Sequence, residues 1–184
     1  LLGDDASGQW YQRLLGPSQI FGYAFPTELP GYNLDPDDAY QFLGFNAAQK
    51  AFARSAMDYI ESVLAVRYQA VGNPAAPNVI AFGNNAQPSI AVHTYPPSDQ
   101  WLGYDIFLDH RFPGTLSPTD GSYAAFWLIH ALGHVLGLEH AYQDGSDPPY
   151  LPFEDQQSRW TMMINDGEPA QCHLAFSPLD VAVL

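Results

Sequence analysis

The sequence predicts an α+β domain in which a mixed sheet of four or five strands packs with two long helices. Short apolar stretches of strand length alternate with two longer stretches of helical periodicity, as in folds that combine both kinds of element around one core. The 184 residues are 47% hydrophobic, which is enough apolar material for a domain of this size. We therefore expect residues 1–184 to form a single domain.

The first half of the chain is predicted to contribute one strand and the longer helix. Residues 20–25 alternate apolar side chains and indicate a strand, and residues 29–33 (Leu-Pro-Gly-Tyr-Asn) are typical of a turn. From Asn46, a favourable N-cap, to about Tyr68, apolar residues recur at helical spacing. Residues 71–78 contain glycine and proline and are expected to form a linker.

The second half is predicted to contribute the remaining strands and the second long helix. Three strands are expected, at residues 78–82, 89–95 and 104–108. A loop over residues 112–121 precedes a helix over residues 122–136, and residues 141–158 show little regular pattern. Ser177 followed by proline favours the start of a further helix over residues 178–184.

The composition excludes several classes of protein. There are 20 acidic and 6 basic residues, so the formal net charge is −14, whereas nucleic-acid binding requires a basic surface. No run of 18 apolar residues is present, so no membrane span is expected. Cys172 is the single cysteine, which excludes an internal disulfide. The chain starts at Leu1 and stops inside a helical pattern, so we expect a fragment or processed form of a longer protein.

The most informative segment is residues 130–140, His-Ala-Leu-Gly-His-Val-Leu-Gly-Leu-Glu-His. His130 and His134 are one helical turn apart and share a face. Gly137 can adopt the left-handed backbone that ends a helix, and this turn would bring His140 round as a third ligand. Three nitrogen ligands with an open fourth position are typical of a catalytic zinc site. A chance arrangement of histidines is the alternative, and the position of Gly137 argues against it.

This segment resembles the long zinc signature of the metzincin metalloproteases, His-Glu-x-x-His-x-x-Gly-x-x-His, with Ala131 in the position of the glutamate. Residues 160–164 are similar to the methionine turn of that family, with Met163 as its methionine; an ordinary core methionine is the alternative. The branch most similar is that of the serralysin-like secreted bacterial proteases. Similar segments lie at residues 45–49, 78–84 and 177–180.

The resemblance implies a secreted zinc endopeptidase with a twisted sheet and a zinc cleft under the edge strand. Zinc would be held by His130, His134 and His140, and a bound water would attack the peptide bond. The substrate would be a protein chain that pairs in extended form with an edge strand. We expect Ala91, Val92, His93 and Thr94 to form that strand. No feature of the sequence indicates an oligomeric state.

Ala131 is the main departure from the family pattern. A methyl group cannot act as the general base, so the chain as it stands is expected to have little or no activity. Two origins are open: a substitution made to silence the enzyme, which the otherwise intact signature favours, and a natural pseudoprotease that binds peptides or a partner protein. A self-processing module of a larger exported protein is a weaker third hypothesis.

Two further positions depart from the family pattern, and one loop is a candidate site for a second kind of cation. Ala141 and Asn165 stand where serralysin-like proteins usually have a proline and a metal-facing tyrosine. The acidic loop at residues 144–147 is a candidate for calcium, although a solvated turn is the favoured interpretation.

Overall fold

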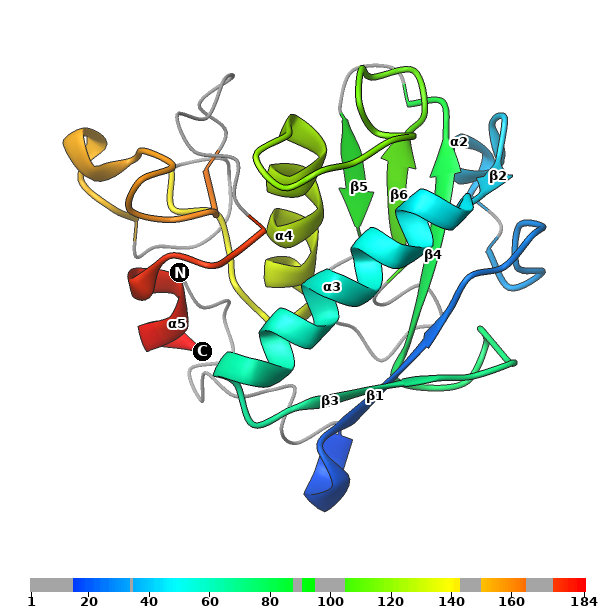
Figure 1. The fold of residues 1–184 in the computed structure, drawn as a ribbon, viewed down its shortest axis with the longest axis horizontal. Coiled ribbons are helices and arrows are strands. Elements are labelled where there is room, and N and C mark those ends of the chain that lie inside the picture. The colour runs from blue at the N-terminus through cyan, green and yellow to red at the C-terminus, as the bar shows by residue number, and fades with distance from the viewer. Residues whose placement is uncertain (1–14, 34, 88–90, 95–104, 143–149, 165–173) are drawn as a thin grey trace.

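The computed structural model describes residues 15–33, 35–87, 91–94, 105–142, 150–164 and 174–184. In this part of the chain, a mixed sheet is combined with two long helices, of which α3 crosses in front of the strands and α4 stands beside the edge of the sheet (Figure 1). The predicted α+β class with two long helices is therefore confirmed. The prediction of one domain over residues 1–184 stays a prediction.

In the described part of the chain, the sheet has six strands. They are β1 (Ile20–Ala24), β2 (Leu43–Gly44), β3 (Arg67–Ala70), β4 (Val79–Asn85), β5 (Val92–Thr94) and β6 (Ile106–Asp109). The order is β3-β1-β4-β6-β5, with β2 paired to β4. The neighbouring pairs among β3, β1, β4 and β6 are parallel, whereas β5 is antiparallel to β6 and β2 is antiparallel to β4. Among the described strands, β5 therefore lies at one end of the sheet order and is paired with β6 alone.

The helices begin at the residues that favour capping. They are α2 (Pro36–Ala39), α3 (Ala47–Val63), α4 (Tyr123–Val135) and α5 (Pro178–Val183), with single 3₁₀ turns η1 (Gly16–Ser18) and η2 (Phe153–Asp155). Asn46 caps α3 in a reciprocal capping box with Gln49, and both of these hydrogen bonds are 3.0 Å long. Ser122 caps α4, and Ser177 caps α5 as the sequence predicts.

Two strands were not predicted. The expected helix from Asn46 to Tyr68 ends at Val63, and β3 follows it, because Arg67–Ala70 pairs in parallel with β1. The expected four or five strands are therefore too few. Strand β3 has mostly exposed side chains and lacks the apolar alternation of a half-buried strand, and β2 has only two residues, so neither has a local sequence signal.

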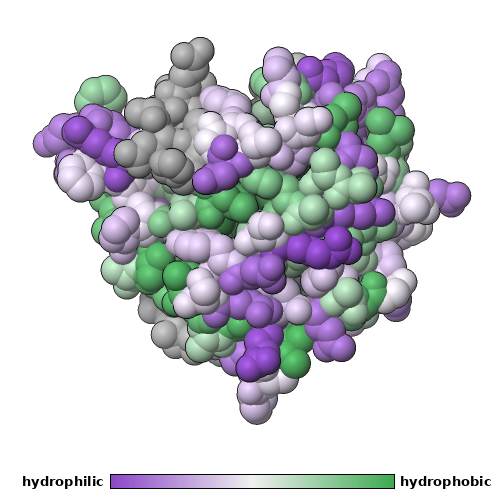
Figure 2. All heavy atoms as spheres, viewed as in Figure 1, coloured by the Kyte–Doolittle hydropathy of each residue, from purple (hydrophilic) through white to green (hydrophobic). Residues whose placement is uncertain are grey.

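Helix α3 is amphipathic and α4 is buried on nearly every side. The outer face of α3 carries polar residues, which form a hydrophilic band across the centre of Figure 2. In contrast, most of α4 is buried, including Ala131, Leu132 and Gly133. Its position is thus fixed by packing on most sides, which makes it a rigid support for the histidines it carries. Within the described residues, no helix has the length and apolar character needed to cross a bilayer.

Candidate metal centre

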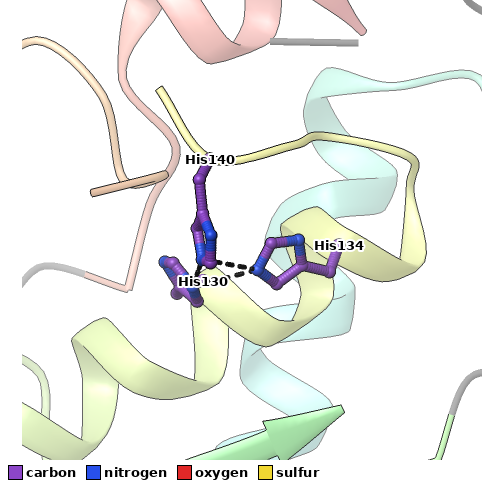
Figure 3. A group of neighbouring side chains, drawn as sticks. All are labelled: His130, His134 and His140. Carbon is purple, nitrogen blue, oxygen red and sulfur yellow. Dashed lines mark hydrogen bonds between the residues drawn. The ribbon is translucent and has the colours of Figure 1, made fainter. Parts of the chain in front are cut away.

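Three histidines converge at the C-terminal end of α4 (Figure 3). His130 and His134 project from the helix itself, one turn apart, and His140 comes from the segment that follows. Gly137 has a φ of 94°, a left-handed conformation that glycine adopts without strain. Its N–H donates to the carbonyl of His134 and the N–H of Leu138 donates to the carbonyl of Gly133, each at 2.9 Å. This Schellman turn ends α4 and reverses the chain, which brings His140 back to the helix.

The three Nε2 atoms form a nearly equilateral triangle. The distances are 3.1 Å between His130 and His134, 3.2 Å between His134 and His140, and 3.3 Å between His140 and His130. A tetrahedral zinc ion with Zn–N bonds of about 2.05 Å would hold its ligand nitrogens about 3.3 Å apart. The three side chains therefore fit a zinc ion in both donor type and spacing, and an open side is left for a fourth ligand.

The other ring nitrogens fix the protonation of two of these histidines. His130 Nδ1 is 2.7 Å from the carbonyl oxygen of Met162, and His134 Nδ1 is 2.8 Å from that of Leu138. Because a carbonyl only accepts, the proton of each neutral ring is on Nδ1 and the lone pair is on Nε2. Burial lowers the pKa of His130 well below its usual range, and the nearby His134 and His140 lower it further. Neutral rings with their lone pairs directed at one point are the form that binds a metal ion.

Met163 packs directly beneath α4 at these ligands. Its side chain is fully buried, and a Cβ added to Gly133 would lie 2.6 Å from its sulfur. Only glycine thus allows the methionine to approach the helix so closely. The backbone of Met163 also accepts a hydrogen bond of 2.7 Å from the N–H of Ala141. A proline at position 141 would lack this donor, so Ala141 adds a link between the chain after His140 and the methionine segment.

A buried carboxylate holds the methionine segment in place. Asp180 accepts hydrogen bonds from Thr161 Oγ1 (2.5 Å), Met162 N (2.9 Å) and Ser177 N (3.0 Å) and is completely buried. The carbonyl of the same residue, Met162, accepts the Nδ1–H of His130. Asp180 and Gly133 are not among the site residues that the sequence predicts. The signals were present, however: a glycine inside an apolar helix and an acidic residue at the third position after a serine cap.

The histidines lie in a cleft of about 430 Å³ between α4 and β5. Its wall is formed by Ala91, Val92, His93, Thr94, Phe112, Tyr123, Trp127, His130, His134, His140 and Tyr142. The four residues predicted to pair with a substrate thus lie beside the histidines, and β5 is an edge strand. The ring of Tyr142 stacks on that of His140, with centroids 4.8 Å apart and an interplanar angle of 21°.

No carboxylate is among the described residues that line this cleft. Ala131 is fully buried and its methyl group belongs to the hydrophobic core cluster. Glu139, which follows Leu138, is also absent from the lining. The described part of the site therefore has metal-binding groups and an edge strand but no group of the type that serves as a general base next to zinc.

Some predicted features lie outside the described residues. These are the ends of the predicted edge strand at Ser89, Ile90 and Tyr95, the loop at residues 144–147, Asn165 and Cys172.

Comparison with known proteins gives one informative result. No family model matches the chain. Serralysin of Proteus mirabilis is 31% identical to it over 171 residues, a match that covers 82% of the chain and 34% of serralysin. The chain therefore spans about a third of the length of this relative. This similarity supports the serralysin-like relationship that the histidine string indicates.

Proposed function

We propose that this chain is the catalytic domain of a zinc-dependent endopeptidase of the serralysin-like metzincin type, in which Ala131 occupies the position of the general base. The observation that carries the proposal is the triangle of three Nε2 atoms, 3.1–3.3 Å apart, in a cleft bordered by an edge strand. The similarity to serralysin supports it independently. By the same similarity, we propose that the protein is secreted.

The histidines, strand β5 and the methionine segment would each have a separate role in the reaction. His130, His134 and His140 would hold the zinc ion, which when bound polarises the substrate carbonyl and lowers the pKa of a bound water. The outer edge of β5 would hold an extended peptide by strand addition, because its outer N–H and C=O groups face away from β6. Met163 and Asp180 would keep the ligands in place from below.

A glutamate at position 131 would remove the proton from the attacking water. Position 131 directly follows His130 on α4, so a longer side chain there would start one residue from a ligand. Loss of a general base typically lowers the rate by about 10² to 10⁴. We therefore propose that the chain binds zinc and peptide but cleaves very slowly. We also propose that the alanine is a substitution made in an otherwise complete site.

The Ala131→Glu variant tests this proposal. With zinc bound, we expect it to cleave casein at least 100-fold faster than the parent chain, on the basis of the usual contribution of a general base. Ala131→Gln is the matched control, because it has the same shape but cannot take a proton, and it should stay as slow as the parent. Zinc content is measured for all three proteins. A folded, zinc-loaded Ala131→Glu variant without proteolytic activity would contradict the endopeptidase assignment.

A peptide-binding pseudoprotease is the second candidate. The observation that favours it is the complete burial of Ala131 within the apolar core cluster, since a natural pseudoenzyme would adapt the position to an apolar side chain. In that case, Ala131→Glu would destabilise the fold by burying a charge and would give no activity. Thermal unfolding of Ala131→Glu and Ala131→Gln beside the cleavage assay therefore distinguishes the two candidates.

A further inference from the structure

Strand β5 is short, and contacts outside its own ladder hold it in place. It has three residues, Val92–Thr94, and within the described residues it pairs with β6 along one side. Figure 1 shows β5 next to β6 on one side and α4 on the other. A strand of this length makes few ladder hydrogen bonds, so contacts at its ends contribute much of its local stability. The contacts at the start of β5 are therefore informative.

Asp109, the last residue of β6, binds the chain on both sides of the connection into β5. Its carboxylate accepts a hydrogen bond of 3.1 Å from the N–H of Gln87, two residues after β4 ends. Its own N–H donates one of 2.9 Å to the carbonyl of Ala91, directly before β5. The side-chain amide of Gln87 also donates to the carbonyl of Phe107 (2.9 Å), the β6 residue that pairs with His93. Asp109 thus fixes the chain where it leaves β4 and where it enters β5.

Arg111 holds this buried carboxylate in one orientation. The side chain of Asp109 has no exposed surface, whereas that of Arg111 is 48% exposed. The guanidinium binds both oxygens, with Nε 3.0 Å from Oδ1 and Nη2 2.7 Å from Oδ2, and the main-chain N–H of Arg111 donates to Oδ1 at 2.8 Å. This two-pronged contact fixes the plane of the carboxylate, so Oδ2 stays directed at the N–H of Gln87.

The same cluster does not contact the site itself. None of Gln87, Asp109 and Arg111 is among the described residues that line the cleft, whereas Ala91 and all three residues of β5 are. Any effect of Asp109 on the site therefore passes through the position of β5.

We infer that Asp109, held by Arg111, is a positioning residue for peptide binding, because it keeps β5 ordered before a peptide pairs with it. This inference rests on the proposed function and adds the residues that set its affinity for peptides. Strand addition needs the N–H and C=O groups of β5 in register, and the free energy of ordering a loose strand is subtracted from that of binding. A ligand that contacts the metal ion alone does not need β5. Loss of Asp109 therefore weakens the binding of peptides and not that of a small chelator.

The test compares metal-chelating ligands of increasing length on zinc-loaded protein. Acetohydroxamate binds the metal ion alone, and hydroxamates of one, two and three alanines add main-chain groups that can pair with β5. The hydroxamate is placed at either end of the peptide in two series, so that both chain directions are tested. Kd is measured by isothermal titration calorimetry for the parent chain and for Asp109→Asn, Arg111→Met and Arg111→Lys. Arg67→Met is the matched control, because Arg67 is an exposed arginine of β3 at the opposite end of the sheet order.

In the parent chain, affinity should rise with peptide length in one of the two series. Asp109→Asn should bind the longest peptide about ten-fold more weakly, the usual effect of losing a hydrogen bond to a buried charged group, and acetohydroxamate as tightly as the parent. Arg111→Met should act in the same direction. Arg111→Lys should have a smaller effect, because an ammonium group keeps the charge but not the two-pronged contact. Arg67→Met should change neither ligand class.

Hydrogen exchange of the metal-free protein gives a second readout that needs neither zinc nor peptide. The amides of residues 92–94 should exchange faster in Asp109→Asn and Arg111→Met than in the parent, whereas those of β1 should keep their protection. Should Asp109→Asn not fold, the two Arg111 variants test the same contact with Asp109 in place.

A gain of affinity with length that is equal in the parent and the variants would overturn the inference, as would unchanged exchange at residues 92–94. An equal loss for acetohydroxamate and peptides would also overturn it, because Asp109 would then act on the whole fold. These outcomes leave the proposed function standing. A parent chain without any gain with length would overturn both the inference and strand addition at β5, and a parent that binds neither zinc nor acetohydroxamate would contradict the proposed function itself.

Discussion

The hydrogen bonds of Asp180 predict that one buried carboxylate supports both the fold and the metal site. We consider the substitution Asp180→Asn, which keeps the size of the side chain and removes its charge. The parent carboxylate accepts three hydrogen bonds of 2.5–3.0 Å, from Thr161, Met162 and Ser177. The carbonyl of Met162 in turn holds the ring of His130 through a hydrogen bond of 2.7 Å.

The size of the effect follows from the number of bonds. Hydrogen bonds to a charged group each contribute about 1.5–3 kcal/mol, and neutral ones about 1 kcal/mol. Asparagine can keep the two bonds to one oxygen at neutral strength and places an N–H₂ group at the third. We therefore expect Asp180→Asn to lower the free energy of unfolding by about 2.5–7 kcal/mol. Because His130 loses part of its support, zinc affinity should fall by about ten-fold or more.

The assay is urea denaturation of the metal-free protein, followed by zinc titration against a competing chelator. Asp58→Asn is the matched control, since Asp58 is on the exposed face of α3, and its effect should stay within about 0.5 kcal/mol. An Asp180→Asn variant whose free energy of unfolding lies within about 1 kcal/mol of that of the parent, with unchanged zinc affinity, would refute the reasoning. The hydrogen bonds of a buried charged group cannot be lost at so small a cost.

Three further predictions concern the same site. Gly133→Ala should lower the free energy of unfolding, measured by urea denaturation, by about 1–3 kcal/mol, because its Cβ would lie 2.6 Å from the Met163 sulfur. The control Gly72→Ala should leave the free energy of unfolding nearly unchanged, because no atom lies within 4 Å of its Cβ. Below pH 6.5, the metal-free protein should lose stability, because the pKa of His130 is lowered in the folded state and only the unfolded chain takes up the proton; His130→Asn should weaken this pH dependence. Zinc at 1,000 times its Kd should stabilise the fold by about 4 kcal/mol, and chelation should reverse the shift in Tm; an unchanged Tm would contradict zinc binding by the folded state.

Local chemistry explains most of the agreement between sequence and structure. Asn46, Ser122 and Ser177 are capping residues whose effect depends on the next three residues, so they predict where helices begin. Likewise, helical periodicity brings His130 and His134 together, and the left-handed turn at Gly137 depends on a single residue. These features can be predicted from neighbouring residues alone, without the rest of the chain.

The missed elements depend on partners distant in the sequence. Strand β3 forms because Arg67–Ala70 lies next to β1, and β2 forms where Asn84 Nδ2 donates to the carbonyls of Leu43 and Gly44. Neither segment has a pattern of its own that would distinguish it from a helix end or a loop.

The sequence by itself determined the class of fold and the string of three histidines at the spacing of a metal site, because residue types at fixed local spacing carry that information. Only the tertiary structure decided that the Nε2 atoms meet at 3.1–3.3 Å with their protons on the far nitrogens of His130 and His134. It also decided that Asp180 supports them and that Trp127 borders the cleft. These contacts join residues from separate elements, and their distances are set by how α4, the sheet and the methionine segment pack together.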